Sequence, residues 1–289
     1  MIYVITGPTC LGKSVTAVYL AKKLNAEIVN GDAFQCYKQM NIGVAKPSEE
    51  LLKEVKHHLY SFVDVDHDYS IAEYQKTLRS TLDEIISRGK DIVLVGGSGL
   101  YIRSALYDYE FEEDKSVDMS KYKNMDNRTL HDELVKIDPV EADKIHMNNR
   151  KRMLRAIEIY LSTGKMKSEI ISEQDHKPIY ETRFFVRDLD REVLYERINK
   201  RVDQMMKEGL FEEVKDLVKK YSPNCHSFQA IGYKEFLPVI NGDETLENAV
   251  ELVKQHTRNY AKRQLTFIRH QFPVEYYVDN GDLWGKING

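Results

Sequence analysis

Cysteine, long apolar runs and an excess of one charge are all scarce in this sequence of 289 residues. Its three cysteines, Cys10, Cys36 and Cys225, are far apart and form no Cys-x-x-Cys pair. That spacing argues against a zinc site, and a chain this long rarely depends on a disulfide scaffold. No apolar run reaches the roughly 20 residues that a membrane helix needs, and no signal segment precedes the first apolar strand. These absences predict a cytoplasmic protein with reduced thiols and no membrane partner.

Net charge and composition exclude little else. The formal net charge is −4, so binding to nucleic acid would have to come from local basic clusters. Hydrophobic residues make up 42% of the chain and charged residues 30%, as in an ordinary globular protein. At this length the chain can bury one large core or two smaller ones.

The clearest motif is a phosphate-binding loop near the N-terminus. Its spacing is Gly, four residues, then Gly-Lys-Ser, and its members are Gly7, Pro8, Thr9, Cys10, Leu11, Gly12, Lys13 and Ser14. An apolar strand at 2–6 precedes it, and apolar residues at helical spacing follow it as far as Asn25. Loop amides at the positive end of a helix dipole favour a chain of phosphates. Lys13 would add a positive charge, and Ser14 a hydroxyl ligand for Mg²⁺.

A second short strand, at 27–30, ends just before Asp32. Ligands of doubly wound sheets lie outside the carboxyl ends of the strands, so Asp32 is expected near the phosphate loop. From position alone, a solvated turn aspartate is an equally good interpretation. The irregular segment at 36–47 contains Gly and Pro and is long enough to carry function.

A third buried strand, at 92–95, is informative because of what does not follow it. A P-loop ATPase or GTPase normally has an aspartate there to hold Mg²⁺, whereas this strand is followed by Gly96 and Gly97. A phosphate-binding loop without that aspartate could hold a diphosphate leaving group instead. Departure of diphosphate from an allylic carbon needs cations and hydrogen-bond donors around its oxygens. The acceptor needs a base, and Asp32 is the best-placed carboxylate.

The order of the other predicted elements defines the fold. An acidic stretch at 110–115 suits a linker, and helical patterns beyond it predict a small all-helical insertion at 112–183. The other expected elements are helices at 48–56, 70–88, 191–208, 210–221 and 244–269 and strands at 182–187 and 274–278. The predicted class is therefore α/β, with a P-loop NTPase-like core of residues 1–111 and 184–289, a mostly parallel sheet and the helical insertion.

Two clusters of basic residues could contact nucleic acid. One opens a helix of the insertion, with Arg150, Lys151, Arg152 and Arg155; the other lies on the last long helix, with Arg258, Lys262, Arg263 and Arg269 and the rings of Tyr260 and Phe267. Basic residues in series neutralise phosphates, and interleaved aromatic rings can stack on bases. Solvated helix faces produce such runs as well, so composition alone leaves both interpretations open.

Seven further segments, in order along almost the whole chain, resemble the tRNA dimethylallyltransferases, also called tRNA isopentenyltransferases. Together with the phosphate loop, the matching segments are residues 31–37, 42–47, 95–101, 152–158, 201–205, 230–234 and 257–264. The phosphate loop alone would not be specific, but the complete set in this order is.

The resemblance implies transfer of a dimethylallyl group from dimethylallyl diphosphate to N6 of the adenine on the 3′ side of the anticodon of tRNA, with release of diphosphate. It implies Mg²⁺ as cofactor, a monomeric enzyme, and tRNA with an adenine-rich anticodon loop as partner. The base would be flipped out of its stack to reach the reacting carbon.

The resemblance also implies roles for individual residues. The loop from Gly7 to Ser14 binds the diphosphate, with a contact from Thr9, and Asp32 is the general base on the adenine amine. Arg201 stabilises the leaving diphosphate, and Arg197 is the second choice. Contacts to tRNA are implied for Asp32, Ala33, Phe34, Gln35, Ser98, Lys151, Arg152, Met153, Leu154 and Arg155, of which the last five lie in the insertion.

The sequence departs from the family pattern at a few positions and leaves alternatives open. Ala33 stands where the family usually has a serine, and Cys10 and Leu11 stand where small polar residues are commoner. A P-loop kinase of small molecules would need a strand-end carboxylate that the chain lacks. A prenyltransferase acting on free adenine nucleotides would give the basic helices no binding role. An RNA-binding protein with an inactive loop conflicts with the intact Lys13 and Ser14.

Overall fold

The computed structural model describes residues 1–111, 117–174 and 176–289, which form two compact units. Met1–Leu106 and Pro178–Gly289 make the larger unit, and Tyr107–Lys177 make the smaller one. Both boundaries lie closer to the N-terminus than those of the predicted insertion at 112–183, and residues 178–183 belong to the larger unit. Ile179 N–H, for example, donates to the carbonyl of Leu106 at 3.0 Å. The linker predicted at 110–115 falls largely on 112–116, outside the described residues.

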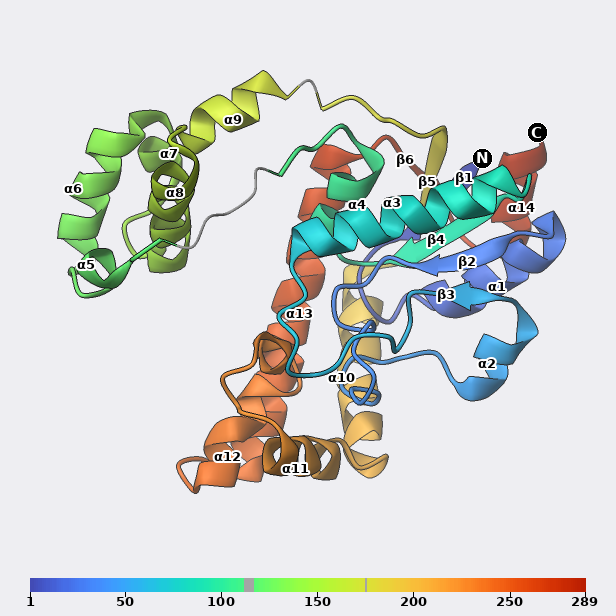
Figure 1. The fold of residues 1–289 in the computed structure, drawn as a ribbon. Helices are drawn as coiled ribbons and strands as arrows, with labels where there is room; N and C mark the ends of the chain where they lie inside the picture. Colours follow the sequence, from blue (N-terminus) through green and yellow to red (C-terminus); the bar gives the residue numbers. More distant parts are fainter. Residues whose placement is uncertain (112–116, 175) are drawn as a thin grey trace. The chain divides into compact units, whose positions relative to one another are not determined.

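The larger unit is built on a six-stranded sheet in which all neighbouring strands are parallel (Figure 1). In spatial order the strands are β3 (His57–His58), β2 (Glu27–Asn30), β4 (Ile92–Gly96), β1 (Ile2–Thr6), β5 (Thr182–Arg187) and β6 (Val274–Tyr277). The predicted parallel sheet is confirmed. β2 and β4 are buried along their whole length, as expected of short apolar strands covered on both faces.

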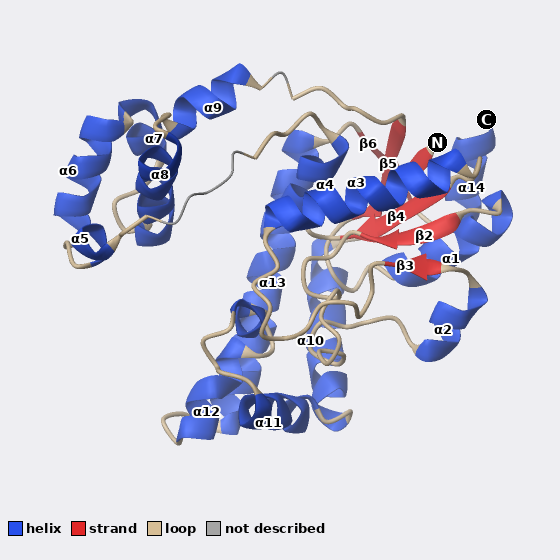
Figure 2. Ribbon diagram, in the orientation of Figure 1, coloured by secondary structure: helices blue, strands red, loops and turns tan. Residues whose placement is uncertain are grey.

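Helices cover both faces of this sheet (Figure 2). α1 (Lys13–Leu24) packs its apolar side on one face, against Ile5, Val93 and Phe185 among others, and α3 (Ile71–Ser87) and α4 (Gly99–Leu106) lie in front of the sheet in this view. The other helices of the unit are α2 (Glu49–Glu54), α10 (Arg191–Lys207), α11 (Leu210–Lys220), η1 (His226–Gln229), η2 (Lys234–Phe236), α12 (Leu237–Asn241), α13 (Leu246–Gln271) and α14 (Asn280–Asn288). α10 packs against α13. Within the described ranges, no helix is both long and apolar enough to cross a membrane.

The secondary-structure elements named in the described part of the smaller unit are all helices, as predicted for the insertion. It comprises α5 (Ser120–Lys123), α6 (Asn127–Ile137), α7 (Pro139–Lys144), α8 (Arg150–Thr163) and α9 (Lys167–Glu173). Leu130, Leu134, Met153 and Ile157 are buried in its own core. The unit therefore has an apolar centre independent of the sheet.

Short elements account for most differences from the predicted secondary structure. β3, α4, α5, α9 and α14 were not expected. The sequence at 229–234 predicts a glycine-bearing turn into a helix, and the structure has parts of η1 and η2 there, followed by α12. Elements this short show too few periodic positions for a pattern, so tertiary contacts decide their conformation. β3, for example, has two residues and forms only where it pairs with β2.

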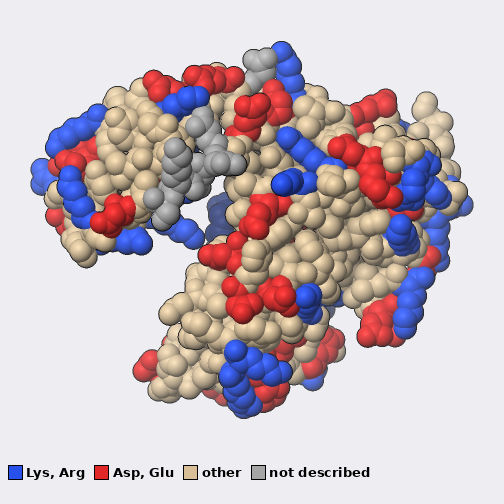
Figure 3. Space-filling view, viewed as in Figure 1, with Lys and Arg blue, Asp and Glu red and all other residues tan. Residues whose placement is uncertain are grey.

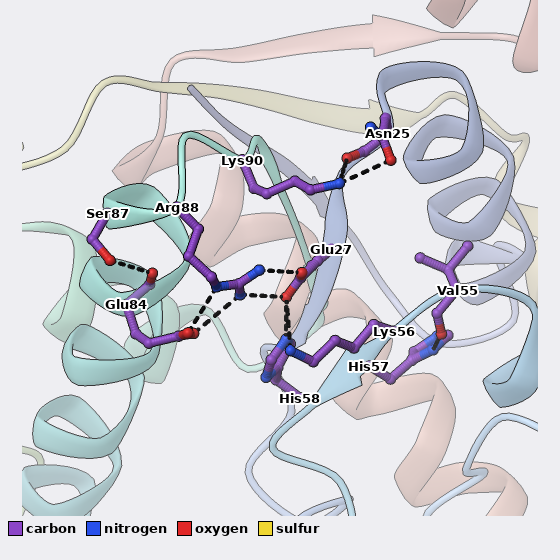
Figure 4. A network of polar contacts seen from close by, with 10 residues as sticks. All are labelled: Asn25, Glu27, Val55, Lys56, His57, His58, Glu84, Ser87, Arg88 and Lys90. Atoms are coloured by element: carbon purple, nitrogen blue, oxygen red, sulfur yellow. Dashed lines mark hydrogen bonds and ion pairs between the residues drawn. The ribbon is translucent and has the colours of Figure 1, made fainter.

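A polar network joins β2, β3 and the end of α3 at the amino end of β2 (Figure 4). The carboxylate of Glu27, only 9% exposed, accepts hydrogen bonds from Nη1 and Nη2 of Arg88 at 2.5 and 2.7 Å. His58 Nε2 lies 2.7 Å from Oε2 of Glu27, and Lys56 Nζ lies 3.5 Å from it. These partners, Arg88 most strongly, lower the pKa of Glu27 to about 2 against the opposing effect of burial.

We expect Glu27→Gln to lower the thermal midpoint of unfolding by about 3–6 °C at neutral pH, because it removes charge-assisted hydrogen bonds from a buried site. A carboxylate whose folded-state pKa is depressed stabilises the fold above its unfolded pKa, and this contribution is lost as the pH falls toward the folded value. The difference from the wild type should therefore shrink between about pH 4.5 and 2. Calorimetric scans at several pH values measure it. Glu84→Gln, which removes an exposed partner of Arg88, is the control, and an equal loss there would contradict the prediction.

Candidate active site

A cavity of about 490 Å³ lies at the carboxyl ends of the central strands, and all of its lining residues belong to the larger unit. Its walls come from the phosphate loop, the segment after β2, the loop at 43–47, one side of α10, residues 229–234 and one side of α13. The cavity therefore lies where ligands of open parallel sheets bind.

The charge of the cavity lining is predominantly positive. Over the larger unit in Figure 3, basic and acidic side chains are interspersed, so surface charge on that face does not mark a site. In the cavity, by contrast, one carboxylate, Asp32, faces the cationic side chains of Lys13, Lys46, Arg201, Lys234 and Arg263. Such a lining favours a ligand that carries several negative charges.

The phosphate loop lies between β1 and the first turn of α1, as predicted. Thr9, Cys10, Gly12, Lys13 and Ser14 line the cavity. The first turn of α1 has no acidic residue and no side-chain cap, which leaves backbone N–H groups for an anion. Nζ of Lys13 donates to the carbonyl of Pro8 at 2.8 Å. Burial lowers the pKa of Lys13 to about 8, although Asp32 and Cys10 oppose that shift.

Three residues of the predicted diphosphate loop do not line the cavity. They are Gly7, Pro8 and Leu11. Leu11 is buried and packs with Leu194, Ile198 and Ala261, so its side chain anchors the loop to α10 and α13. Leu11 stays a predicted member of the diphosphate-binding loop, and because its apolar side chain points into the core, a contact to the ligand would come from its backbone.

Asp32 follows the carboxyl end of β2 and lines the cavity. Its Oδ1 accepts the backbone N–H of Phe34 at 2.9 Å, and its own N–H donates to Oδ1 of Asn30 at 3.0 Å. Burial raises the pKa of Asp32, while the Phe34 amide and the nearby Lys13 ammonium oppose the rise. A fixed carboxylate with a raised pKa is a better proton acceptor than a solvated one. The interpretation as a solvated turn aspartate does not fit this environment.

The structure separates the two candidate arginines of α10. Arg201 lines the cavity together with Ile198 and Val202, and it contributes to the lowered pKa of Lys13. Arg197, one helical turn earlier, is exposed and does not line the cavity. Arg201 is therefore the arginine placed to meet a phosphate oxygen.

Close packing explains why β4 ends in glycines. A Cβ on Gly96 would lie 2.1 Å from the backbone of Gly31, and one on Gly97 would lie 2.2 Å from Nε2 of Gln264. Gln264 donates that nitrogen to the carbonyl of Gly97 at 2.8 Å. The position at which a nucleotide hydrolase has its metal-binding aspartate is thus occupied by a contact between the sheet and α13.

The residues predicted to contact tRNA near Asp32 differ in their surroundings. Phe34 and Gln35 line the cavity, whereas Ala33 and Ser98 do not. Ser98 is buried, and its Oγ accepts the N–H of Ala33 at 3.0 Å. Ser98 therefore supports the segment that carries Asp32 rather than presenting its hydroxyl to the cavity.

The predicted tRNA-binding residues of the smaller unit lie in the first turns of α8. Lys151, Arg152 and Arg155 are exposed, and Arg155 also pairs with Glu158 at 2.8 Å. Leu154 is half-buried, and Met153 is fully buried in the core of the unit. The tRNA contact predicted for Met153 stays a prediction, and its side chain lies on the side of the helix that faces inward.

The donor set fits Mg²⁺ only in part. Within the described ranges, no three His, Cys, Asp or Glu side chains come together as a metal site. Mg²⁺, however, keeps several waters and is commonly held by one or two protein oxygens and the phosphates of the substrate. The hydroxyl of Ser14, on the cavity wall, could supply one such oxygen.

Several lining residues were not predicted from the sequence as site residues. They include Tyr60, Lys46 and Thr257, whereas Tyr260 and Arg263, which also line the cavity, belong to the basic and aromatic cluster predicted on the last long helix. Thr257, Tyr260 and Arg263 lie within the segment 257–264, whose family resemblance was the available signal. Tyr60 follows the two-residue strand β3 and carried no signal at all.

Comparison with known families gives one consistent match. The family described as IPP transferase matches residues 35–271. A tRNA dimethylallyltransferase of Oceanobacillus iheyensis is 41% identical over 280 residues, covering 94% of this chain and 89% of the relative. One of Staphylococcus aureus is 43% identical over 284 residues, covering 95% and 91%.

Solved structures agree with the sequence matches. A tRNA delta(2)-isopentenylpyrophosphate transferase of Staphylococcus epidermidis superposes with a TM-score of 0.74 at 40% identity, covering 99% of this chain and 96% of that one. A eukaryotic dimethylallyltransferase acting on tRNA gives a TM-score of 0.83 at 30% identity, covering 99% and 77%. The predicted P-loop-like α/β class is confirmed by these neighbours.

Proposed function

This chain belongs to the IPP transferase family, and we propose that it transfers a dimethylallyl group from dimethylallyl diphosphate to N6 of an adenosine in tRNA. The observation that carries the proposal is the presence of one carboxylate and several cations in a single cavity. Asp32, after β2, lines this cavity together with Lys13, at the start of α1, and Arg201, on α10. This arrangement suits a reaction in which an amine loses a proton while a diphosphate departs.

The reaction can be followed by its bonds. The N6 nitrogen of adenine forms a bond to C1 of the dimethylallyl group, the C1–O bond breaks, and its electron pair leaves with the diphosphate. The proton displaced from N6 passes to the carboxylate of Asp32. Lys13, Arg201 and the amides of the phosphate loop stabilise the charge on the departing oxygens. Mg²⁺, when bound at Ser14, would add positive charge beside the same oxygens.

We propose finer features of the substrate on the family resemblance. The target would be the adenosine on the 3′ side of the anticodon, in tRNAs with an adenine-rich anticodon loop, and the enzyme would act as a cytoplasmic monomer. Lys151, Arg152 and Arg155 would contact the phosphates of the tRNA, since they are exposed basic side chains at the start of α8.

A direct assay tests this function. Purified protein should attach a dimethylallyl group to unmodified tRNA when dimethylallyl diphosphate and Mg²⁺ are supplied, as read by the mass of the modified adenosine. AMP in place of tRNA serves as the second acceptor. Modification of AMP but not of tRNA would contradict the proposal and favour a transferase of free nucleotides.

We expect kcat/KM for dimethylallyl diphosphate to depend on pH in a bell-shaped manner. Asp32 must be ionised, and its pKa is raised, so activity should fall on the acid side above the usual carboxylate range. Lys13 must be protonated, and its pKa is about 8, so activity should fall above about pH 8. Burial also lowers the pKa of Lys46 to about 8, so Lys46 is the other candidate for the fall in activity at alkaline pH. Lys13→Arg, which stays charged, should remove this fall. If the fall persists in Lys13→Arg, it belongs to a group other than Lys13.

A further inference from the structure

A carboxylate outside the cavity holds one of the cavity walls. Glu213, on α11, accepts backbone N–H groups from Asn41 at 3.0 Å, from Ile42 at 3.0 and 3.2 Å, and from Gly43 at 3.3 Å. It also accepts the hydroxyl of Tyr233 at 2.6 Å. Four donors thus converge on one side chain, and they join α11 to two segments that are distant from it in sequence.

The contact between these two segments is also tight. A Cβ on Gly43 would lie 2.4 Å from Cε2 of Tyr233, so only glycine allows the ring to pack there. The ring of Tyr233 is fully buried. Backbone and ring are therefore held against each other both by packing and by their shared partner, Glu213.

The loop that Glu213 holds has a conformation that needs support. Ala45 has a φ of 57°, in the left-handed region that non-glycine residues rarely adopt. Such a residue persists only where its surroundings fix the backbone. Nζ of Lys46 donates to the carbonyls of Tyr37 and Lys38 and to Oδ1 of Asn41, which closes the loop on itself.

This loop forms part of the cavity wall beside the segment that carries Asp32. Its residues from Gly43 to Pro47 line the cavity, and Nε2 of Gln35 donates to the carbonyls of Val44 and Ala45 at 3.0 and 3.2 Å. Gln35 is three residues after Asp32 in the same segment. The wall is thus hydrogen-bonded to the segment that carries the proposed base. Among the described residues, no hydrogen bond joins the wall to the phosphate loop.

We infer that Glu213 is a positioning residue whose carboxylate, with Tyr233, fixes the wall at 43–47 so that the acceptor nucleotide is held against Asp32. This inference rests on the proposed prenyl transfer to tRNA. It gives a role to two segments of the family resemblance, 42–47 and 230–234, that the chemistry of diphosphate departure does not explain.

The test compares Glu213→Ala with Glu212→Ala. Glu212 lies on the same helix, is exposed and pairs with Lys215 at 3.0 Å, so its removal changes the charge without touching the loop. We expect Glu213→Ala to lower kcat/KM for tRNA by about 10- to 100-fold, because a small misplacement of a reacting group costs this much. The Kd for dimethylallyl diphosphate, measured by calorimetry without tRNA, should stay within about twofold of wild type. Glu212→Ala should match the wild type in both measurements.

Two further variants keep the inference testable if Glu213→Ala does not fold. Tyr233→Phe keeps the ring on Gly43 and removes one hydrogen bond, so kcat/KM for tRNA should fall by about 3- to 10-fold. Glu213→Gln, which retains one acceptor oxygen, should recover part of the activity lost in Glu213→Ala. The effects of Tyr233→Phe and Glu213→Ala should not add, since both act on one contact.

Distinct outcomes would overturn the inference. One is a Glu213→Ala enzyme with wild-type kinetics on tRNA; another is equal loss of tRNA turnover and of diphosphate affinity, which indicates general damage to the fold. Unchanged kinetics of Tyr233→Phe would also overturn it. If the wild-type protein itself fails to modify tRNA, the proposed function fails instead.

Discussion

Asp32→Asn should lower the rate of prenyl transfer by about 10²- to 10⁴-fold, the range attributed to a positioned general base. Asparagine has nearly the same shape and can still accept the N–H of Phe34 through its amide oxygen, so the turn after β2 should persist. It cannot take up the proton displaced from N6. Single-turnover kinetics with saturating tRNA and dimethylallyl diphosphate measure the chemical step directly, and filter binding reports whether tRNA still binds.

The control for Asp32→Asn is Asp64→Asn. Asp64 is an exposed aspartate that pairs with Lys38 at 2.9 Å, away from the cavity lining. This variant should react like the wild type. Removal of a general base is expected to lower the rate by about 10²-fold or more. If Asp32→Asn keeps more than about a tenth of the wild-type rate, the proton must leave by another route.

Arg201→Ala should reduce kcat by about 10²- to 10³-fold, comparable to the loss of one preorganised donor at a developing charge. The guanidinium of Arg201 lies at the same cavity as Lys13 and the phosphate loop. Its main effect should be on kcat, because the negative charge on the departing oxygens increases as the C1–O bond breaks. Steady-state kinetics with both substrates varied separate this effect from weaker binding.

Arg197→Ala is a matched control on the same helix. It removes the same guanidinium one turn away, from an exposed position outside the cavity lining. We expect kcat within about twofold of the wild type, as for an ordinary surface substitution. Equal losses in Arg197→Ala and Arg201→Ala would mean that long-range charge, rather than a contact in the cavity, accounts for the effect.

Local sequence signals were sufficient to predict the centre of the site. The phosphate loop is a motif of eight consecutive residues between a strand and a helix, and Asp32 follows the next strand. In a parallel sheet, strand order and direction alone bring such positions together. The choice between Arg201 and Arg197 needed the structure, because residues four apart on a helix share a face and only packing against α13 shows which one reaches the cavity.

Contacts between distant segments could not be predicted in this way. Glu213 and Asn41 are 172 residues apart in sequence, and neither occurs in a periodic pattern that points to the other. Met153 and Leu11 show a related limit: each lies beside predicted site residues in sequence, and its apolar side chain points into a core. Sequence proximity identifies the right segment, whereas side-chain direction depends on the packing of the whole unit.

The glycines at the end of β4 restrict how this fold can change its chemistry. The Cβ of an aspartate at position 97 would need the space that Gln264 Nε2 occupies and would lie 3.0 Å from the carbonyl oxygen of Gly7. A single substitution would therefore displace the Gln264 side chain and break its hydrogen bond to the Gly97 carbonyl before it created a metal ligand. A metal ligand at the end of this strand is thus coupled to a change at Gln264 on α13. That coupling makes the intermediate steps unfavourable.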